Sequence, residues 1–247
     1  MSAPLDRLRH RFRDGLVHWF VHRGWAWVRA TGAVTAGTGT GRRFRRFGPG
    51  STMAFPTGTL FGEPWIEIGA DTLVGEQVTL SAGMVPGQDL GPDPVIRIGD
   101  RCAIGRGSHV VGHLSIDIGD DVYTGPYVYI TDQNHGYSDP AQPIGRQWPH
   151  NEPVRIGAGS WLGANAVVLP GARIGRNVVV AAGSVVRGEF PDHCVLAGVP
   201  ARIVRRHVPG RGWEPPLRAV PGPAPVTGLP ADPAAEDLVP GETTQAG

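Results

Sequence analysis

The most regular hydrophobic pattern in the chain runs from Ile156 to Val186. Branched aliphatic residues occupy every sixth position of this stretch, at Ile156, Leu162, Val168, Ile174, Val180 and Val186. Two residues before each of the later aliphatic positions lies a small or β-branched residue, at Ser160, Ala166, Ala172, Val178 and Ser184. A period of six fits neither an α-helix nor an alternating strand. It is typical of a parallel β-helix, in which each hexad forms one short strand and one turn.

Earlier parts of the chain carry the same period. The aliphatic or β-branched positions fall in three runs: Ile68, Val74, Leu80; Ile98, Ile104, Val110, Ile116; and, shifted by two residues, Ile118, Thr124, Ile130. Gly and Pro interrupt the hexads over 84–94, and polar residues interrupt them over 132–153, so we expect loops to leave the β-helix at both places. Interruptions of a repeat commonly map to functional loops.

The first 50 residues follow a different pattern. Apolar residues recur at helical spacing from Leu5 to Val28 with Arg and His between them, which predicts a basic amphipathic helix. One interpretation is that this helix caps the open end of the β-helix, which would otherwise expose strand edges. The other is peripheral attachment to an anionic membrane surface, where Arg and Trp are favoured. A Gly- and Thr-rich linker over 35–50 carries Arg42, Arg43, Arg45 and Arg46, either as a solvated loop or as part of a phosphate-attracting patch.

Three regions are therefore expected: the basic amphipathic helix and linker over 1–50, the β-helix over 51–206, and a tail over 207–247. Residues 190–206 suggest a last strand and the start of a short helix. The tail is rich in Pro, Ala and Gly with little apolar content, and such segments stay disordered because they cannot bury enough surface.

Composition excludes several classes of protein. The 247 residues carry a formal net charge of only +1, so no global signal points to nucleic acid. The chain contains no Lys, and its two cysteines do not make a disulfide framework. No apolar run approaches the ~20 residues of a transmembrane helix, and the start lacks the apolar core of a signal peptide. A cytoplasmic protein, peripheral at the inner face of the membrane if the helix binds lipid, is the expectation.

The segment from about 98 to 206 resembles the hexapeptide-repeat acyltransferases, and most closely the maltose, galactoside and nodulation-type O-acetyltransferase group. The matching stretches are ITDQNH at 130–135, WLGANAVVLPGARIG at 161–175, AAGSVV at 181–186 and AGVPAR at 197–202. The resemblance implies a left-handed β-helix, a homotrimer with active sites between neighbouring subunits, and acetyl-CoA or another acyl-CoA as co-substrate, with no bound cofactor or metal. The handedness rests on the resemblance, since parallel crossovers are otherwise nearly always right-handed.

The motif match makes His135 the catalytic histidine. An alcohol is a poor nucleophile at neutral pH, and a positioned base raises its reactivity. Histidine has a suitable unperturbed pKa for this role. Asp132 and Asn134 flank His135 and are expected to orient the imidazole or bind the acceptor, the alternative being turn formation. His113, on an earlier hexad, is a further candidate for acceptor binding.

The resemblance implies that Trp161 occupies the position of a residue that forms a wall of the acetyl-CoA channel. Because Leu162 keeps the hexad register, Trp161 should point outward, against either the pantetheine arm or a neighbouring subunit. Gly163, Ala164 and Ala182 match small residues along the same groove. Small side chains let a slender ligand approach the main chain, although corner packing alone would also explain them.

Two arginines complete the expected donor site. Arg187 and Arg202 lie where the phosphates of CoA can be met, and Arg pairs well with phosphate. The family often has Lys in the dipeptide that is Arg187–Gly188 here, so this contact departs from the pattern.

The acceptor is left open by the sequence. Sugar acetyltransferases hold it with Asn and Asp on earlier coils, whereas this chain has GRGSH at 105–109. A hydroxyl of a sugar or glycan-like molecule is expected, with an aminosugar N-acetyltransferase as the alternative. A γ-class carbonic anhydrase would use His109, His113 and His135 around zinc, but the first two are four residues apart and the family's usual separation is five. A non-catalytic scaffold is the remaining alternative.

Overall fold

A computed structural model describes residues 3–216, with side chains from residue 15 onward. The chain divides into two units, Met1–Pro215 and Pro216–Gly247. Only Pro216 of the second unit is described, so most of the expected disordered tail, residues 217–247, lies outside the described residues.

The predicted N-terminal helix is confirmed as α1 (Ala3–Gly32), which Gly24 does not interrupt. Near its C-terminal end, Arg29 forms an ion pair with Glu76, and Val34 then bridges to Met53 of the first coil. The side chains of residues 15–27 are exposed, so the described part of α1 does not cap the β-helix. Among the described residues, no helix combines the length and apolar character that crossing a bilayer would require.

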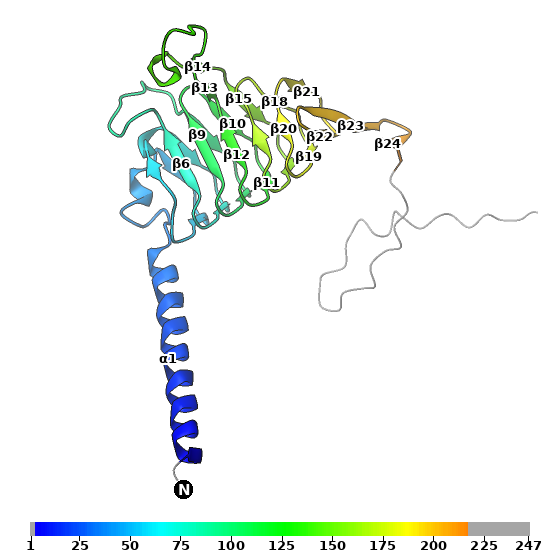
Figure 1. Ribbon diagram of the computed structural model, residues 1–247. Helices are drawn as coiled ribbons and strands as arrows, with labels where there is room; N and C mark the ends of the chain where they lie inside the picture. Colours follow the sequence, from blue (N-terminus) through cyan, green and yellow to red (C-terminus); the bar gives the residue numbers. More distant parts are fainter. Residues whose placement is uncertain (1–2, 217–247) are drawn as a thin grey trace, which may run out of the picture. The chain divides into compact units, whose positions relative to one another are not determined.

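Three sheets, each of short strands, form the faces of a prism through which the chain winds repeatedly (Figure 1). Sheet I contains, in spatial order, β1 (Arg46–Phe47), β4 (Ile66–Ile68), β7 (Ile96–Ile98), β10 (Ile116–Ile118), β15 (Val154–Ile156), β18 (Arg173–Ile174) and β21 (Glu189–Phe190).

Sheets II and III form the other two faces. Sheet II contains β2 (Thr52–Met53), β5 (Leu73–Val74), β8 (Ala103–Ile104), β11 (Tyr123–Thr124), β16 (Trp161–Leu162), β19 (Val179–Val180), β22 (Cys194–Gly198), β23 (Ala201–Val208) and β24 (Gly212–Glu214). Sheet III contains β3 (Leu60–Phe61), β6 (Thr79–Ala82), β9 (His109–Gly112), β12 (Tyr129–Thr131), β17 (Val167–Val168) and β20 (Val185–Val186).

The six-residue repeat accounts for the core and the corners of the prism. The six aliphatic residues from Ile156 to Val186 are all buried and fill its core. The small residues are buried at the corners, where the Ser160 hydroxyl donates to the Gly175 carbonyl and accepts from the Val178 N–H, each at 3.1 Å. Neighbouring strands pair in parallel with matched positions, as in Leu162 with Val180. The expected fold, a left-handed parallel β-helix of hexapeptide repeats, is confirmed.

Both predicted interruptions leave the prism. One lies between β6 and β7. The other, between β12 and β15, contains the two-stranded antiparallel pair β13 (Gln133–Asn134) and β14 (His150–Asn151) and the short 3₁₀ helix η3 (Ile144–Arg146).

Two expectations at the ends of the repeat need correction. The stretch over 35–50 is no free linker, because η1 (Gly41–Arg43), the buried Phe44 and β1 belong to the first coil. Three of its arginines form ion pairs with carboxylates: Arg43 with Glu63, Arg45 with Glu67 and Arg46 with Asp100. Such pairing reduces their attraction for phosphate.

The expected short helix near residue 206 is wrong. Residues of AGVPAR instead join β22 and β23, which pair in antiparallel fashion, and β24 extends the same sheet. Glycine at 198, with a positive φ of 103°, allows the reversal. Strand structure thus continues past the expected boundary at 206. A second 3₁₀ turn, η2 (Glu63–Trp65), closes the first coil at the opposite end.

Candidate active site

His135 lies on the loop that leaves the prism after β12. It follows β13 directly, and its neighbour Asn134 pairs with His150 of β14. Both His135 and Asn134 are exposed. This short antiparallel pair anchors the loop (Figure 1), so His135 lies at the base of the loop and not at its tip.

A pocket of about 350 Å³ opens beside His135. It lies where the loop meets the turns that follow β17 and β20. Its lining residues are Asn134, His135, Tyr137, Ser138, His150, Glu152, Leu169, Pro170 and Arg187. Three residues that the sequence singled out, His135, Asn134 and Arg187, are therefore brought together, although the sequence assigned Arg187 to the donor.

Asp132 has a different position from the one expected. It is fully buried, and its carboxylate accepts backbone hydrogen bonds from His113 at 2.8 Å and from Leu114 and Ser115 at 2.7 Å each. Carboxylates that accept several N–H groups form strong, short hydrogen bonds. Asp132 therefore holds the turn after β9 in the neighbouring coil, and this use of its carboxylate leaves it poorly placed to bind an acceptor.

The turn that Asp132 holds carries His113. This histidine is half-buried, and its Nδ1 has no hydrogen-bond partner among the described residues. Burial lowers the pKa of His113 from its ordinary 6.5, the nearby His135 lowers it further, and the charge of Asp132 opposes both effects. His113 is therefore neutral at neutral pH. A neutral imidazole can both donate and accept hydrogen bonds.

The polar part of this site occupies one corner of the prism. We name the corner between sheets III and I the loop edge; it contains the loop over 132–153 and the turns at 169–172 and 187–188. The corner between sheets II and III, with turns at 125–128, 163–166 and 181–184, we name the repeat edge. The two edges border opposite sides of sheet III.

Most of the expected donor residues lie at the repeat edge. Gly163 donates its N–H to the Val180 carbonyl at 2.7 Å, and a Cβ added at Gly163 would lie 2.5 Å from the Ala182 nitrogen. Ala164 accepts from the Gly183 N–H at 2.9 Å, which completes a close stack of backbone turns. Trp161 lies just before this stack and is exposed over 52% of its surface, so its predicted outward direction is confirmed.

Arg202 lies on β23, in the terminal hairpin, whose Gly198 N–H donates to the Ser184 hydroxyl of the repeat edge at 3.2 Å. One guanidinium nitrogen donates to the carbonyl of Ala201 at 2.9 Å. Within one chain, the expected donor residues are thus divided among the repeat edge, the loop edge with Arg187, and the terminal hairpin with Arg202.

Sequence reasoning missed six of the nine residues that line the pocket: Tyr137, Ser138, His150, Glu152, Leu169 and Pro170. His150 lies on the returning strand β14, and Glu152, which follows that strand directly, donates its N–H to the Asp132 carbonyl at 2.8 Å. The available signal was that the interruption begins at Asp132 and ends at Pro153, so its two ends must meet where the coil resumes. The antiparallel pairing that aligns them cannot be derived from the hexad period.

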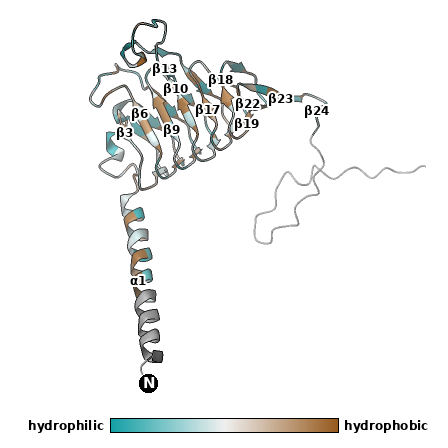
Figure 2. Ribbon diagram, in the orientation of Figure 1, coloured by the Kyte–Doolittle hydropathy of each residue, from teal (hydrophilic) through white to brown (hydrophobic). Residues whose placement is uncertain are grey.

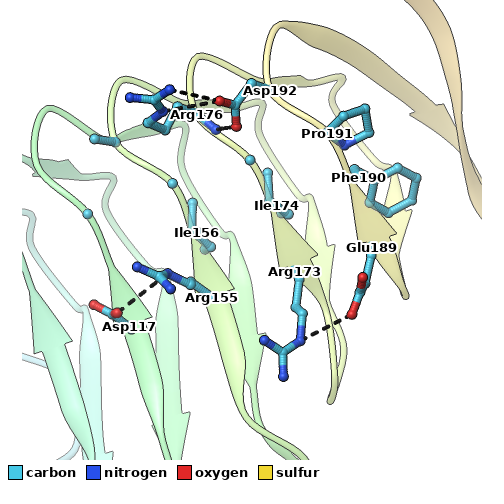
Figure 3. Close-up of a pocket in the computed structure, with 14 residues that line it drawn as sticks. Asp117, Arg155, Ile156, Arg173, Ile174, Arg176, Glu189, Phe190, Pro191 and Asp192 are labelled. Carbon is cyan, nitrogen blue, oxygen red and sulfur yellow. Dashed lines mark hydrogen bonds and ion pairs between the residues drawn. The ribbon is translucent and has the colours of Figure 1, made fainter.

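A larger hollow of about 710 Å³ lies on the outer face of sheet I (Figure 3). Ion pairs line it: Arg155 with Asp117 at 3.8 Å, Arg173 with Glu189 at 3.3 Å and Arg176 with Asp192 at 3.0 Å. Its arginines are already paired, and none of the expected site residues borders it. The chemistry therefore favours the smaller pocket beside His135.

The three histidines of the metal hypothesis are not assembled within one chain. His109 points outward from β9, with its ring centroid 6.3 Å from that of Tyr129. Over the part of the chain whose side chains are described, no group of three or more His, Cys, Asp or Glu residues could hold a metal ion.

Comparison with known proteins supports the hexapeptide repeat. Residues 153–188 match the family model "Bacterial transferase hexapeptide (six repeats)", and residues 95–131 match "Hexapeptide repeat of succinyl-transferase".

Two proteins of Escherichia coli K12 are similar to this chain. One, WbbJ, is named for lipopolysaccharide biosynthesis as an O-acetyl transferase. It is 41% identical over 120 residues, which cover 46% of this chain and 61% of that protein. The other is a galactoside O-acetyltransferase, 32% identical over 120 residues, which cover 46% of this chain and 58% of the relative. The resemblance to the hexapeptide-repeat O-acetyltransferase group is confirmed.

A solved structure shows the same fold. AntD, an N-acyltransferase from Bacillus cereus in complex with dTDP and 3-hydroxybutyryl-CoA, superposes with a TM-score of 0.56 at 19% identity. The match covers 68% of this chain and 85% of AntD. The chain spans 61% and 58% of the length of the two Escherichia coli relatives, and 46% of that of two further acetyltransferases.

Proposed function

We propose that this protein, whose repeats resemble those of the hexapeptide acyltransferases, transfers an acetyl or other short acyl group from acyl-CoA to a hydroxyl of a sugar or glycan-like acceptor. The observation that carries the proposal is His135, exposed at a pocket of about 350 Å³ on the loop that interrupts the repeat. The names of both relatives, one for galactoside and one for lipopolysaccharide O-acetylation, support a glycan hydroxyl as acceptor.

His135 acts as the general base. Its imidazole accepts the acceptor's hydroxyl proton while the oxygen attacks the thioester carbonyl carbon. The carbon–sulfur bond then breaks, and the imidazolium returns the proton to the departing thiolate. The products are an O-acyl ester and free CoA, with no net gain or loss of protons.

Asn134 and His113 serve the acceptor side. Asn134 is exposed in the pocket beside His135, and its amide can both donate to and accept from sugar hydroxyls. His113 does not line this pocket and its Nδ1 is buried, so an acceptor would contact it through the other nitrogen of the ring. Asp132 acts indirectly, by holding the turn that carries His113.

We further propose a homotrimer whose sites lie between subunits. The division of the expected donor residues supports it, since the loop edge and the repeat edge of one chain border opposite sides of sheet III. A neighbouring chain that brings its repeat edge to the loop edge of the first would combine His135 with Trp161, Gly163, Ala164 and Ala182. Arg187 and Arg202 remain the candidates for the phosphates of CoA.

The catalytic proposal can be tested by following release of free thiol from acetyl-CoA with a panel of mono- and oligosaccharides. We expect His135→Ala to lower kcat about 10²–10⁴-fold without changing the melting temperature. His109→Ala is the matched control, because His109 is exposed on β9 and lies outside the pocket. Wild-type turnover in His135→Ala would overturn the proposed base.

Product chemistry separates the alternatives. An ester product is cleaved by hydroxylamine, whereas an amide from an aminosugar is not. Equal losses in His135→Ala and His109→Ala, together with zinc-dependent hydration of carbon dioxide, would instead favour the metal reading.

The donor site has its own test. Trp161→Ala should weaken acetyl-CoA binding about tenfold in calorimetry, because an aromatic wall of the channel is lost. Leu73→Ala is the control, since Leu73 is equally exposed on the same face of sheet II, at 54%. If the wild-type protein bound no acetyl-CoA, with or without sugars, the non-catalytic scaffold would be the remaining hypothesis.

A further inference from the structure

The second half of α1 exposes an unusual density of large apolar side chains. Between residues 16 and 27, each of the following is at least half exposed: Leu16, Val17, Trp19, Phe20, Val21, Trp25 and Trp27. Figure 2 shows hydrophobic and hydrophilic residues interleaved along the coloured part of α1. Isolated exposed apolar residues are ordinary on protein surfaces, but a contiguous patch marks an interaction site.

The arrangement of this patch around the helix favours a broad partner. At ~100° per residue, Leu16 and Phe20 lie on one side, whereas Val17 and Val21 lie about 100° further round. His18 and His22, whose rings lie 4.1 Å apart, are on the remaining side, whereas Arg23 falls between Trp19 and Leu16. A groove or a helical seam on another protein covers only a stripe about 100° wide. The interfacial region of a bilayer can surround a larger part of the circumference.

Charge points to the same partner. Residues 1–32 contain six arginines and two aspartates, a net charge of +4, whereas the whole chain carries only +1. Like charges oppose the close association of several copies of α1, but they attract an anionic lipid surface. Arg23 lies over the ring of Trp19 at 5.6 Å, and a long arginine side chain can extend from an apolar face to the headgroups.

We propose that α1 docks the protein on an anionic lipid bilayer, with Trp19, Trp25 and Trp27 at the boundary between headgroups and acyl chains. Trp is favoured at this boundary, and basic residues near it are attracted by anionic lipid. The docking does not depend on the acyltransferase proposal, because it uses no residue of the pocket or of either edge.

The test uses the full-length protein and vesicle flotation. Vesicles of phosphatidylcholine alone are compared with vesicles of equal parts phosphatidylcholine and phosphatidylglycerol. Wild-type protein should float with the anionic vesicles, and less so as salt is raised. The combined Trp19→Ala, Trp25→Ala and Trp27→Ala variant should lower the partition coefficient at least about tenfold.

Two controls accompany this variant. Trp148→Ala removes a tryptophan that is 84% exposed outside α1, and should float like the wild type. Arg23→Glu tests charge alone and should weaken flotation on anionic vesicles only. Circular dichroism and sedimentation verify that each variant keeps its fold and its assembly.

Three outcomes would overturn the proposal. The wild type could fail to float with anionic vesicles, or the tryptophan variant could float as well as the wild type. The tryptophan variant could also lose the oligomeric state of the wild type while neither protein binds vesicles. That last result would identify α1 as a self-association surface.

Discussion

The two edges that border sheet III differ in how far they follow the hexad period. At the repeat edge the period is unbroken, and the backbone turns at Gly163 and Ala182 stack so closely that a single Cβ would meet a backbone nitrogen at 2.5 Å. At the loop edge the period is broken by residues 132–153, and polar side chains gather around His135. Regular stacking leaves little room for chemistry, whereas an interruption can aim side chains freely. This fold gains stability from its stacked repeats and gathers polar side chains where the repeat is interrupted.

Asp132 lies where the regular repeat ends and the loop begins, and its replacement should have the largest effect on the free energy of unfolding. Asp132→Ala leaves three backbone N–H groups of the 113–115 turn without their acceptor. Leaving a buried donor unsatisfied costs about 1–3 kcal/mol, so we expect a loss of roughly 3 kcal/mol or more in the free energy of unfolding. Denaturant titration at a fixed protein concentration measures this loss.

Asp139→Ala is the matched control for that variant. Asp139 lies on the same loop, and its carboxylate accepts a single backbone hydrogen bond, from the Ala141 N–H at 2.9 Å. It should change stability by no more than about 1 kcal/mol. Equal unfolding free energies for the two variants would contradict the special role of Asp132 at the base of the loop.

A pair of glycine substitutions sharpens the contrast between the edges. Gly163→Ala places a methyl group against the Ala182 backbone, and overpacking of this kind costs about 1–3 kcal/mol. Gly145→Ala on the loop meets nothing within 4 Å and should leave the stability unchanged or slightly raised. Thermal unfolding measures the stability of both variants. A Gly163→Ala variant as stable as the wild type would contradict the close stacking of the turns.

The smallest expected effect is the pH dependence contributed by His113. Its pKa is lowered in the folded protein, chiefly by burial, so the unfolded chain binds a proton more readily. The contribution to stability is complete above the unfolded value of 6.5 and declines as the pH falls through the lower folded value. His113→Gln should therefore flatten the loss of stability as the pH falls from neutrality to below 6.5.

Unfolding free energies of the wild type and His113→Gln, measured across this range, give the difference directly. A steeper pH dependence in the variant would contradict the lowered pKa of His113.

Most of the fold was predictable because the hexad period is a local property. The buried position of each aliphatic from Ile156 to Val186 follows from its place in the six-residue repeat. The same argument placed Trp161 outward, one residue before the buried Leu162. The prediction of a short helix near residue 206 was wrong because AGVPAR forms a reversal between two long strands. This segment lies beyond the last position of the six-residue repeat, so the period could not predict its structure.

Residues of the pocket could be predicted only where they belong to a sequence motif of the family. His135 and Asn134 were found in this way, and both line the pocket. His150 and Glu152 were not found, because they reach the pocket through the antiparallel return of a loop about which the period says nothing. Asp132 was found but given a role at the acceptor, since a sequence does not show that three N–H groups of another coil already bind its carboxylate.

Three features could be predicted from spacing along one segment: the residues that point inward, the places of the two interruptions and the helix rich in Arg and Trp that precedes the repeat. The folded structure was needed to show which corner of the prism each site residue occupies and how Asp132 is bound. It was also needed to show that the described part of α1 leaves its apolar side chains uncovered. Each of these depends on contacts between residues far apart in the chain, and such contacts exist only once the coils are stacked.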